Sequence, residues 1–312
     1  MIWRIASTVV SIAFVLVLGQ LGWRALQQRT ARPGGILNAS QAQPAGRLEF
    51  SVASSPVRPT DCTSGGDFAV PAASNADSLT TAQASPFGRP ESGWEIYAPL
   101  ISYEINTRCP PQSPGFAAAL ARWQSVHHPP ASGVIDAQTL QTFKLIWLNR
   151  RPFVAATMHG SCPLPPSPDR LNWTLPGESF GSKPVQLRPA ALAAYRAMIA
   201  VARSEAPELA ADHRLMTIFS GFRDPAGDEV RCFAGGCNTV TRASCSAHRT
   251  GLAVDLFLGS APGYPPDSSA DPNRLFQSRS AAYGWLVANA AHFGFVNYPF
   301  EPWHWEWTGE AP

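Results

Sequence analysis

The sequence has no clusters of basic residues. Its 24 Lys and Arg residues nearly balance 22 Asp and Glu residues, giving a net charge of +2, and the basic residues are almost all Arg, scattered without runs. Because a nucleic-acid-binding surface normally appears as a clustered basic patch, we expect no nucleic-acid partner. The 30 prolines lie mostly before residue 190 and around 262–272, which favours long irregular connections over a compact helical bundle.

The chain begins with an apolar segment. From Ile5 to Trp23 it is interrupted by only a few small or polar residues, and Arg24 follows. Residues 1–24 are therefore interpreted as a signal peptide or membrane anchor. No clear small-x-small cleavage site follows, which favours an uncleaved anchor in the inner membrane. Residues 25–90, dominated by Ala, Gln, Pro, Gly and Ser, are expected to form a flexible linker. The predicted location is the cell envelope or periplasm.

Six cysteines agree with export. An even number in an exported chain predicts disulfides, although six cysteines allow fifteen pairings. Cys232 and Cys237 flank a short loop and could pair with each other. A structural zinc site built from Cys232, Cys237 and Cys245 is a weaker alternative, because the chain has no C-x-x-C unit.

Residues 91–152 are expected to form a small helical domain. Phe116–Gln124 has the spacing of an amphipathic helix, and Asp136 is placed to cap a second helix running through Phe143. The segment Gly-x-Ile-Asp-x-x-Thr-Leu, which starts at Gly133, resembles the helical peptidoglycan-binding repeat. A helical spacer without binding function is the alternative.

Residues 153–312 are expected to form an α+β domain with a small antiparallel sheet and flanking helices. The predicted helices are 189–206 and 280–291, and the predicted strands are 215–220, 252–258, 293–297 and 303–307. Along 252–258, apolar side chains alternate with Ala253, Asp255 and Phe257, so Asp255 projects from one face of a strand.

Two short segments carry the chemistry. His248 lies seven residues before Asp255, a span of roughly 23 Å when extended, so the chain must fold back, and Gly251 allows this. In the second segment, Glu301-Pro-Trp-His304, the proline and the alternating tryptophans favour extended chain over the helical pair of an H-E-x-x-H protease. Two imidazoles, one carboxylate ligand and one spare carboxylate are the components of an open catalytic zinc site.

The two segments also resemble a known family. Ser246-x-His-x-x-Gly-x-Ala-x-Asp255, followed by Glu301-x-x-His304 and preceded by Ser220-Gly-Phe-Arg223, is similar to the zinc D-alanyl-D-alanine carboxypeptidases of bacterial cell walls. These enzymes, of the vancomycin-resistance carboxypeptidase type, are related to the lysostaphin and hedgehog zinc fold. The resemblance covers roughly residues 185–307. It implies Zn²⁺ as the cofactor and the following roles: His248, Asp255 and His304 as metal ligands, Glu301 as general base, and Arg223 as the group that polarises the scissile carbonyl. Apart from the resemblance, Ser246 and Trp303 are candidate substrate contacts, with the alternative that Ser246 only orients the His248 loop.

The resemblance predicts an enzyme that removes the terminal D-alanine from peptidoglycan stem peptides. The alternatives are an endopeptidase that cuts an L,D or cross-bridge amide, a non-catalytic zinc-bearing wall-binding or signalling domain, and an iron oxygenase. Arg223 has a plainer interpretation as the ion-pair partner of Asp224 or Asp228.

Overall fold

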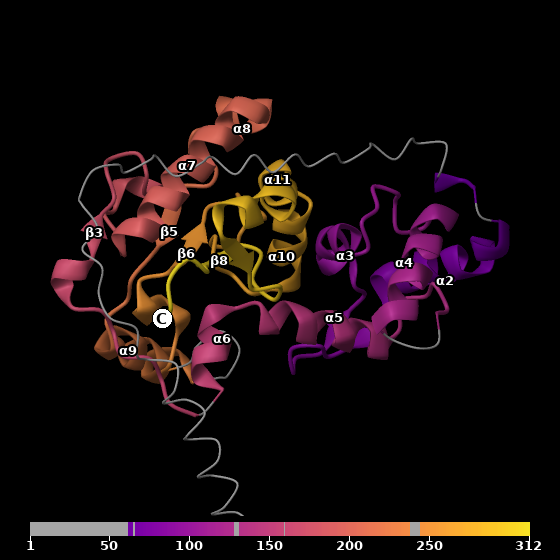
Figure 1. Ribbon diagram of the computed structural model, residues 1–312, viewed down its shortest axis with the longest axis horizontal. Coiled ribbons are helices and arrows are strands. Elements are labelled where there is room, and N and C mark those ends of the chain that lie inside the picture. The colour runs from indigo at the N-terminus through magenta and orange to yellow at the C-terminus, as the bar shows by residue number, and fades with distance from the viewer. Residues whose placement is uncertain (1–61, 65, 128–130, 159, 238–243) are drawn as a thin grey trace, which may run out of the picture. The chain divides into compact units, whose positions relative to one another are not determined.

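The computed structural model describes residues 62–64, 66–127, 131–158, 160–237 and 244–312 (Figure 1). The expected anchor, residues 1–24, and the first part of the expected linker lie outside these residues. Within the described ranges, no helix combines the length and the apolar character needed to cross a membrane.

A four-stranded antiparallel sheet carries the candidate site. Its strands, in the order β5-β6-β8-β7, are Ile218–Ser220, Ala253–Leu256, His304–Trp307 and Phe295–Asn297. All four predicted strands are therefore confirmed, although each is shorter than expected. β6 is buried along its whole length, as expected of a central strand between β5 and β8. Two short hairpins complete the strand set: β1 (Gln83–Ala84) with β2 (Glu91–Ser92), and β3 (Asn172–Trp173) with β4 (Gln186–Leu187).

The α-helices lie before and between these strands in the sequence, and the sheets are antiparallel, so the predicted α+β class is confirmed (Figure 1). They are α2 (Ala69–Thr81), α3 (Ala98–Glu104), α4 (Pro114–His127), α5 (Ala137–Asn149), α6 (Pro152–Thr157), α7 (Pro189–Glu205), α8 (Pro207–Ala211), α9 (Pro225–Gly235), α10 (Asp271–Ser278) and α11 (Ala281–Asn289). Short 3-10 turns are η2 (Gly66–Phe68), η3 (Glu95–Tyr97), η4 (Pro168–Arg170), η5 (Phe180–Ser182), η6 (Ala247–Thr250) and η7 (Ala290–Phe293).

Side-chain caps mark where several helices begin. The expected cap at Asp136 is present, because its carboxylate accepts a hydrogen bond from the Thr139 amide at the start of α5. Asp224, one of two carboxylates considered as partners for Arg223, instead caps α9 by accepting from the Ala226 amide. α7 confirms the helix predicted at 189–206, and the residues that recur on it with helical spacing are all buried: Leu192, Tyr195, Met198, Ile199 and Ala202.

The expected flexible linker must be corrected over its C-terminal third. Residues 69–81 form α2, and Asn75 on that helix is fully buried. Its side-chain amide donates to the Gly133 carbonyl at 2.9 Å, and its carbonyl oxygen accepts from the Ile135 amide at 2.9 Å. Small and polar residues suggested disorder, but here they allow a helix to pack closely on the segment before α5.

The helical region and the sheet region pack together within one compact unit, residues 55–312. Their hydrophobic core is continuous from Trp94 to Trp305. The fully buried guanidinium of Arg274 on α10 donates to the hydroxyl of Tyr97 at 2.7 Å and to the Phe300 carbonyl at 2.8 Å. The segment expected as a separate helical domain therefore shares its core with the region that carries the candidate site.

All six cysteines are paired. The disulfides are Cys62–Cys109, Cys162–Cys245 and Cys232–Cys237, so the expected local pair is confirmed and no cysteine remains for a structural zinc site. Three disulfides are typical of an exported or extracellular protein. Cys162–Cys245 joins the segment after α6 to the residue directly before Ser246.

Candidate metal centre

The register between β6 and β8 brings two of the predicted ligands together. Asp255 pairs directly with His304, so both side chains leave the same face of the sheet. Two residues further along that face, Glu306 is opposite Ala253. Since an alanine side chain is small, it leaves space for the Glu306 carboxylate beside the two predicted ligands.

His248 reaches this face from a tight turn. It lies on η6, where the Ser246 hydroxyl accepts a hydrogen bond from the His248 amide at 3.2 Å. The turn ends at Gly251, which has a φ of 70° in the left-handed region. A Cβ at Gly251 would lie 2.9 Å from the Leu171 side chain, so the fold-back predicted at this glycine also requires its lack of a side chain.

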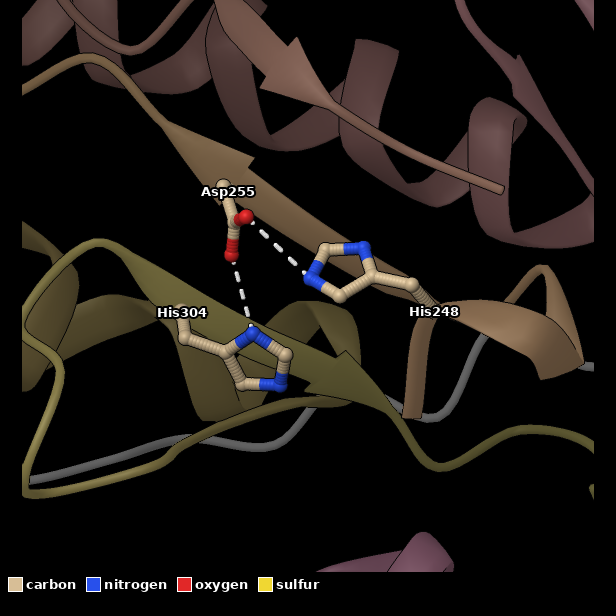
Figure 2. A group of neighbouring side chains, drawn as sticks. All are labelled: His248, Asp255 and His304. Carbon is tan, nitrogen blue, oxygen red and sulfur yellow. Dashed lines mark hydrogen bonds and ion pairs between the residues drawn. The ribbon is translucent and has the colours of Figure 1, made fainter. Parts of the chain in front are cut away.

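His248, Asp255 and His304 form one buried group (Figure 2). The three residues are 2 %, 5 % and 4 % exposed. Asp255 lies between the imidazoles, with Oδ2 at 3.1 Å from Nε2 of His248 and Oδ1 at 2.9 Å from Nδ1 of His304. One ligand atom from each residue lies within 4.8 Å of the other two, so the group could hold a metal ion.

The remaining nitrogen of each imidazole has its own partner. Nδ1 of His248 lies 2.7 Å from the Gly221 carbonyl, so its N–H donates there and leaves Nε2 directed at Asp255. Nε2 of His304 lies 3.3 Å from Oε1 of Glu306. Partners of this kind fix the orientation of a metal-ligating histidine and determine which nitrogen is available to the metal.

Glu306 contacts the His-Asp-His group but was absent from the predicted set of site residues. Its carboxylate is buried and accepts from Nε of Arg151 at 2.7 Å. Burial alone would raise its pKa, but Arg151 and His304 hold that pKa at about 2. The sequence could have indicated Glu306 through the alternation of a strand, because Glu306 is two residues from His304 and its side chain is therefore on the same face.

The charges of the group suit metal binding. Burial opposes ionisation of Asp255, yet the two imidazoles hold its pKa well below the usual range. Burial and the nearby Arg223 lower the pKa of His248 to about 4, so this imidazole is neutral at pH 7. Burial would also lower the pKa of His304, but hydrogen bonds to Asp255 and Glu306 raise it to about 9. Binding of a cation is therefore expected to displace a proton from His304.

Glu301 occupies the turn that leads into β8. Its amide donates to the Tyr298 carbonyl at 2.9 Å, and its own carbonyl accepts from the His304 amide at 2.9 Å. Burial raises the pKa of its carboxyl group to about 7, with Asp255 adding to the effect and His304 opposing it. Glu301 is not a member of the His-Asp-His group.

Arg223 makes both kinds of contact that were considered for it. Its Nε donates to Asp228 at 2.9 Å, so the plainer interpretation as an ion-pair partner is correct for that carboxylate. Its other nitrogens donate to the hydroxyls of Ser220 and Ser246 at 3.0 and 2.9 Å. The guanidinium also lies 3.9 Å from Oδ2 of Asp255. The ion pair therefore holds Arg223 next to the His-Asp-His group.

A single cavity of about 1090 Å³ opens at the group. Every residue singled out from the sequence lines it: Arg223, Ser246, His248, Asp255, Glu301, Trp303 and His304. Trp303 is almost fully buried, and it forms part of the cavity wall.

No known protein-family model and no characterised protein matches this chain. Its site is therefore characterised by geometry: a buried His-Asp-His group, a carboxyl group with a pKa near neutrality and a guanidinium, all facing the same cavity.

Replacing Glu306 with Gln should weaken metal binding by about 10–100-fold, because a ligating histidine then loses its charged partner. A competition titration with a chromophoric chelator measures this. The matched control is Glu310→Gln, since Glu310 forms an ion pair with Arg188 near the C-terminus. Equal affinities in the two variants would contradict a role for Glu306 in orienting His304.

Proposed function

We propose that the protein is a zinc-dependent D-alanyl-D-alanine carboxypeptidase that trims peptidoglycan stem peptides. The observation that supports this most strongly is the gathering of seven residues, drawn from three separate sequence segments, around one cavity. The resemblance of these segments to the zinc carboxypeptidases supplies the reaction and substrate class.

The donor set is suitable for zinc. Two imidazole nitrogens and one carboxylate oxygen are the ligands of open catalytic zinc sites, in which a fourth position is left to water or substrate. His248 presents Nε2 and His304 presents Nδ1, and the second nitrogen of each ring is already engaged. When bound, zinc supplies a Lewis acid and lowers the pKa of a coordinated water toward 7.

Glu301 and Arg223 have complementary roles in hydrolysis. An ionised Glu301 accepts the proton of the attacking water and later delivers it to the leaving amine. Arg223 carries a permanent charge and stabilises the oxyanion that develops on the scissile carbonyl. Its contacts with Asp228, Ser220 and Ser246 hold the guanidinium in place before the substrate binds.

Incubation with defined peptides tests the reaction. The zinc-loaded chain should release free D-alanine from a muramyl pentapeptide, and mass spectrometry should show the loss of one terminal residue. New termini inside the peptide or between cross-linked peptides would instead indicate an endopeptidase. Binding to purified wall without any hydrolysis would favour a non-catalytic wall-binding protein. Metal analysis that finds iron in place of zinc would favour the oxygenase alternative.

The rate should depend on pH through Glu301. Because burial raises the pKa of this carboxyl group to about 7, the ionised base is lost as pH falls through that value. We expect kcat/KM to fall about tenfold per pH unit below pH 6 and to level off above pH 8. A rate profile from pH 5 to 9, recorded with metal occupancy checked at each pH, measures this. A flat profile at constant occupancy would contradict the assignment of the base.

A further inference from the structure

One wall of the cavity at the His-Asp-His group is formed by α5, α6 and the residues between them, called the helical region below. The lining residues that it contributes, all from α5, α6 and the short connection between them, are Lys144, Leu148, Arg151, Phe153, Val154 and Thr157. Lys144, Leu148 and Arg151 belong to residues 91–152, the region that resembles a peptidoglycan-binding repeat, so that region borders the same space as the His-Asp-His group.

Hydrogen bonds from the Arg151 guanidinium and the Phe153 amide attach this wall to Glu306, beside the His-Asp-His group. Arg151, directly before α6, donates from Nε to Glu306 at 2.7 Å, and the Phe153 amide donates to the other carboxylate oxygen at 3.2 Å. Glu306 in turn faces Nε2 of His304. One buried carboxylate thus connects the start of α6 to a predicted metal ligand, so the wall has a defined position relative to the reaction centre.

Both lysines of the chain, Lys144 and Lys183, line this cavity. Within the described residues neither one forms an ion pair, whereas the cavity-lining Arg151 and Arg223 are paired with Glu306 and Asp228. The Lys144 ammonium lies over the ring of Phe87, 5.4 Å from its centre, on the side of the cavity formed by α5.

An ammonium group without a carboxylate partner is available to an anionic ligand. Lysine carries a compact charge on a flexible stem, so it can follow a carboxylate whose position varies with the substrate side chain. The helical wall also presents the apolar groups of Leu148, Phe153 and Val154, which can contact the body of a peptide.

We propose that Lys144 binds a side-chain carboxylate of the peptide substrate, with Lys183 adding to the positive potential, so that the helical region selects acidic peptides. This inference rests on the proposed peptidase function and specifies its substrate class. The helical region is thus a part of the substrate site, and Lys144 determines specificity without taking part in bond cleavage.

Matched peptides test the inference. Each ends in D-alanyl-D-alanine and carries either glutamate or glutamine one, two or three residues before that pair. Together the three positions cover about 10 Å of extended chain. The full zinc-loaded chain should cleave at least one glutamate peptide with a kcat/KM roughly tenfold above that of its glutamine counterpart, mainly through a lower KM.

The variants isolate the charge of Lys144. Lys144→Gln should bring the ratio of kcat/KM for the glutamate peptide to that for the glutamine peptide to about one, whereas Lys144→Arg should retain the preference for glutamate. Arg122→Gln, at an exposed position of α4 outside the cavity, is the control for a general loss of positive charge. An undiminished glutamate preference in Lys144→Gln, or none in the unmodified chain, would overturn the inference.

A binding measurement separates this inference from the reaction itself. Calorimetry with the same peptides and the zinc-loaded Glu301→Gln chain reports affinity without turnover. If no peptide is cleaved but glutamate is still preferred in binding and the preference disappears in Lys144→Gln, the reaction is wrong and the acidic-peptide site stands. Cleavage without any charge preference in either assay would support the reaction and overturn the acidic-peptide site.

Discussion

Replacing Glu301 with Gln should lower kcat for D-alanine release by a factor of about 10²–10⁴ while the protein keeps its fold and its metal. The amide has nearly the same shape as the carboxyl group but cannot accept the proton of the attacking water. Because Glu301 is outside the His-Asp-His group, its replacement leaves all three ligands in place. The measurement combines the rate of D-alanine release with metal content and thermal unfolding.

The matched control for this variant is Glu208→Gln, at an exposed position of α8. Glu208 is far from both motifs in the sequence. Its replacement removes one carboxylate of the same type, and the variant should keep full activity. If Glu301→Gln also keeps full activity with zinc bound, Glu301 is not the base and the proton must go to another group.

Replacing Asp255 with Asn should remove stoichiometric metal binding and reduce hydrolysis to background. The Asp255 carboxylate lies between both imidazoles, at 3.1 and 2.9 Å, and is the only anion of the His-Asp-His group. The amide oxygen of asparagine carries no charge and is therefore a weaker ligand for a divalent cation.

Metal content after dialysis, measured by mass spectrometry of the metal, reports this loss. Asp267→Asn is the control, because Asp267 lines the same cavity and is exposed. A full equivalent of zinc retained by Asp255→Asn at nanomolar free metal would contradict the assignment of Asp255 as a ligand.

The strands, and the position of Asp255 on one of them, were predictable from sequence for a local reason. Alternation along 252–258 placed Asp255 on one face of a strand, and the glycine at 251 indicated where the chain folds back toward it. The partner strand was readable from its alternating tryptophans. The register that sets Asp255 opposite His304 was not derivable from either strand alone, since it depends on how the two segments meet in the folded chain.

Long-range contacts explain what the sequence did not reveal. Arg151 and Glu306 are 155 positions apart, and nothing in the residues around either one predicts that they meet. The linker expectation failed for the same reason. The helix at 69–81 is stabilised by the hydrogen bonds of Asn75 with residues near 134, which composition over a local window cannot show.

The Cys162–Cys245 disulfide couples the assembly of the site to the redox state of its surroundings. Cys245 directly precedes Ser246, whose hydroxyl both caps the turn of His248 and accepts from Arg223. In a reducing cytosol this tether is open, and the turn loses its anchor to the segment beyond α6. The proposed site would then depend on an oxidising compartment, in which a disulfide of this kind persists.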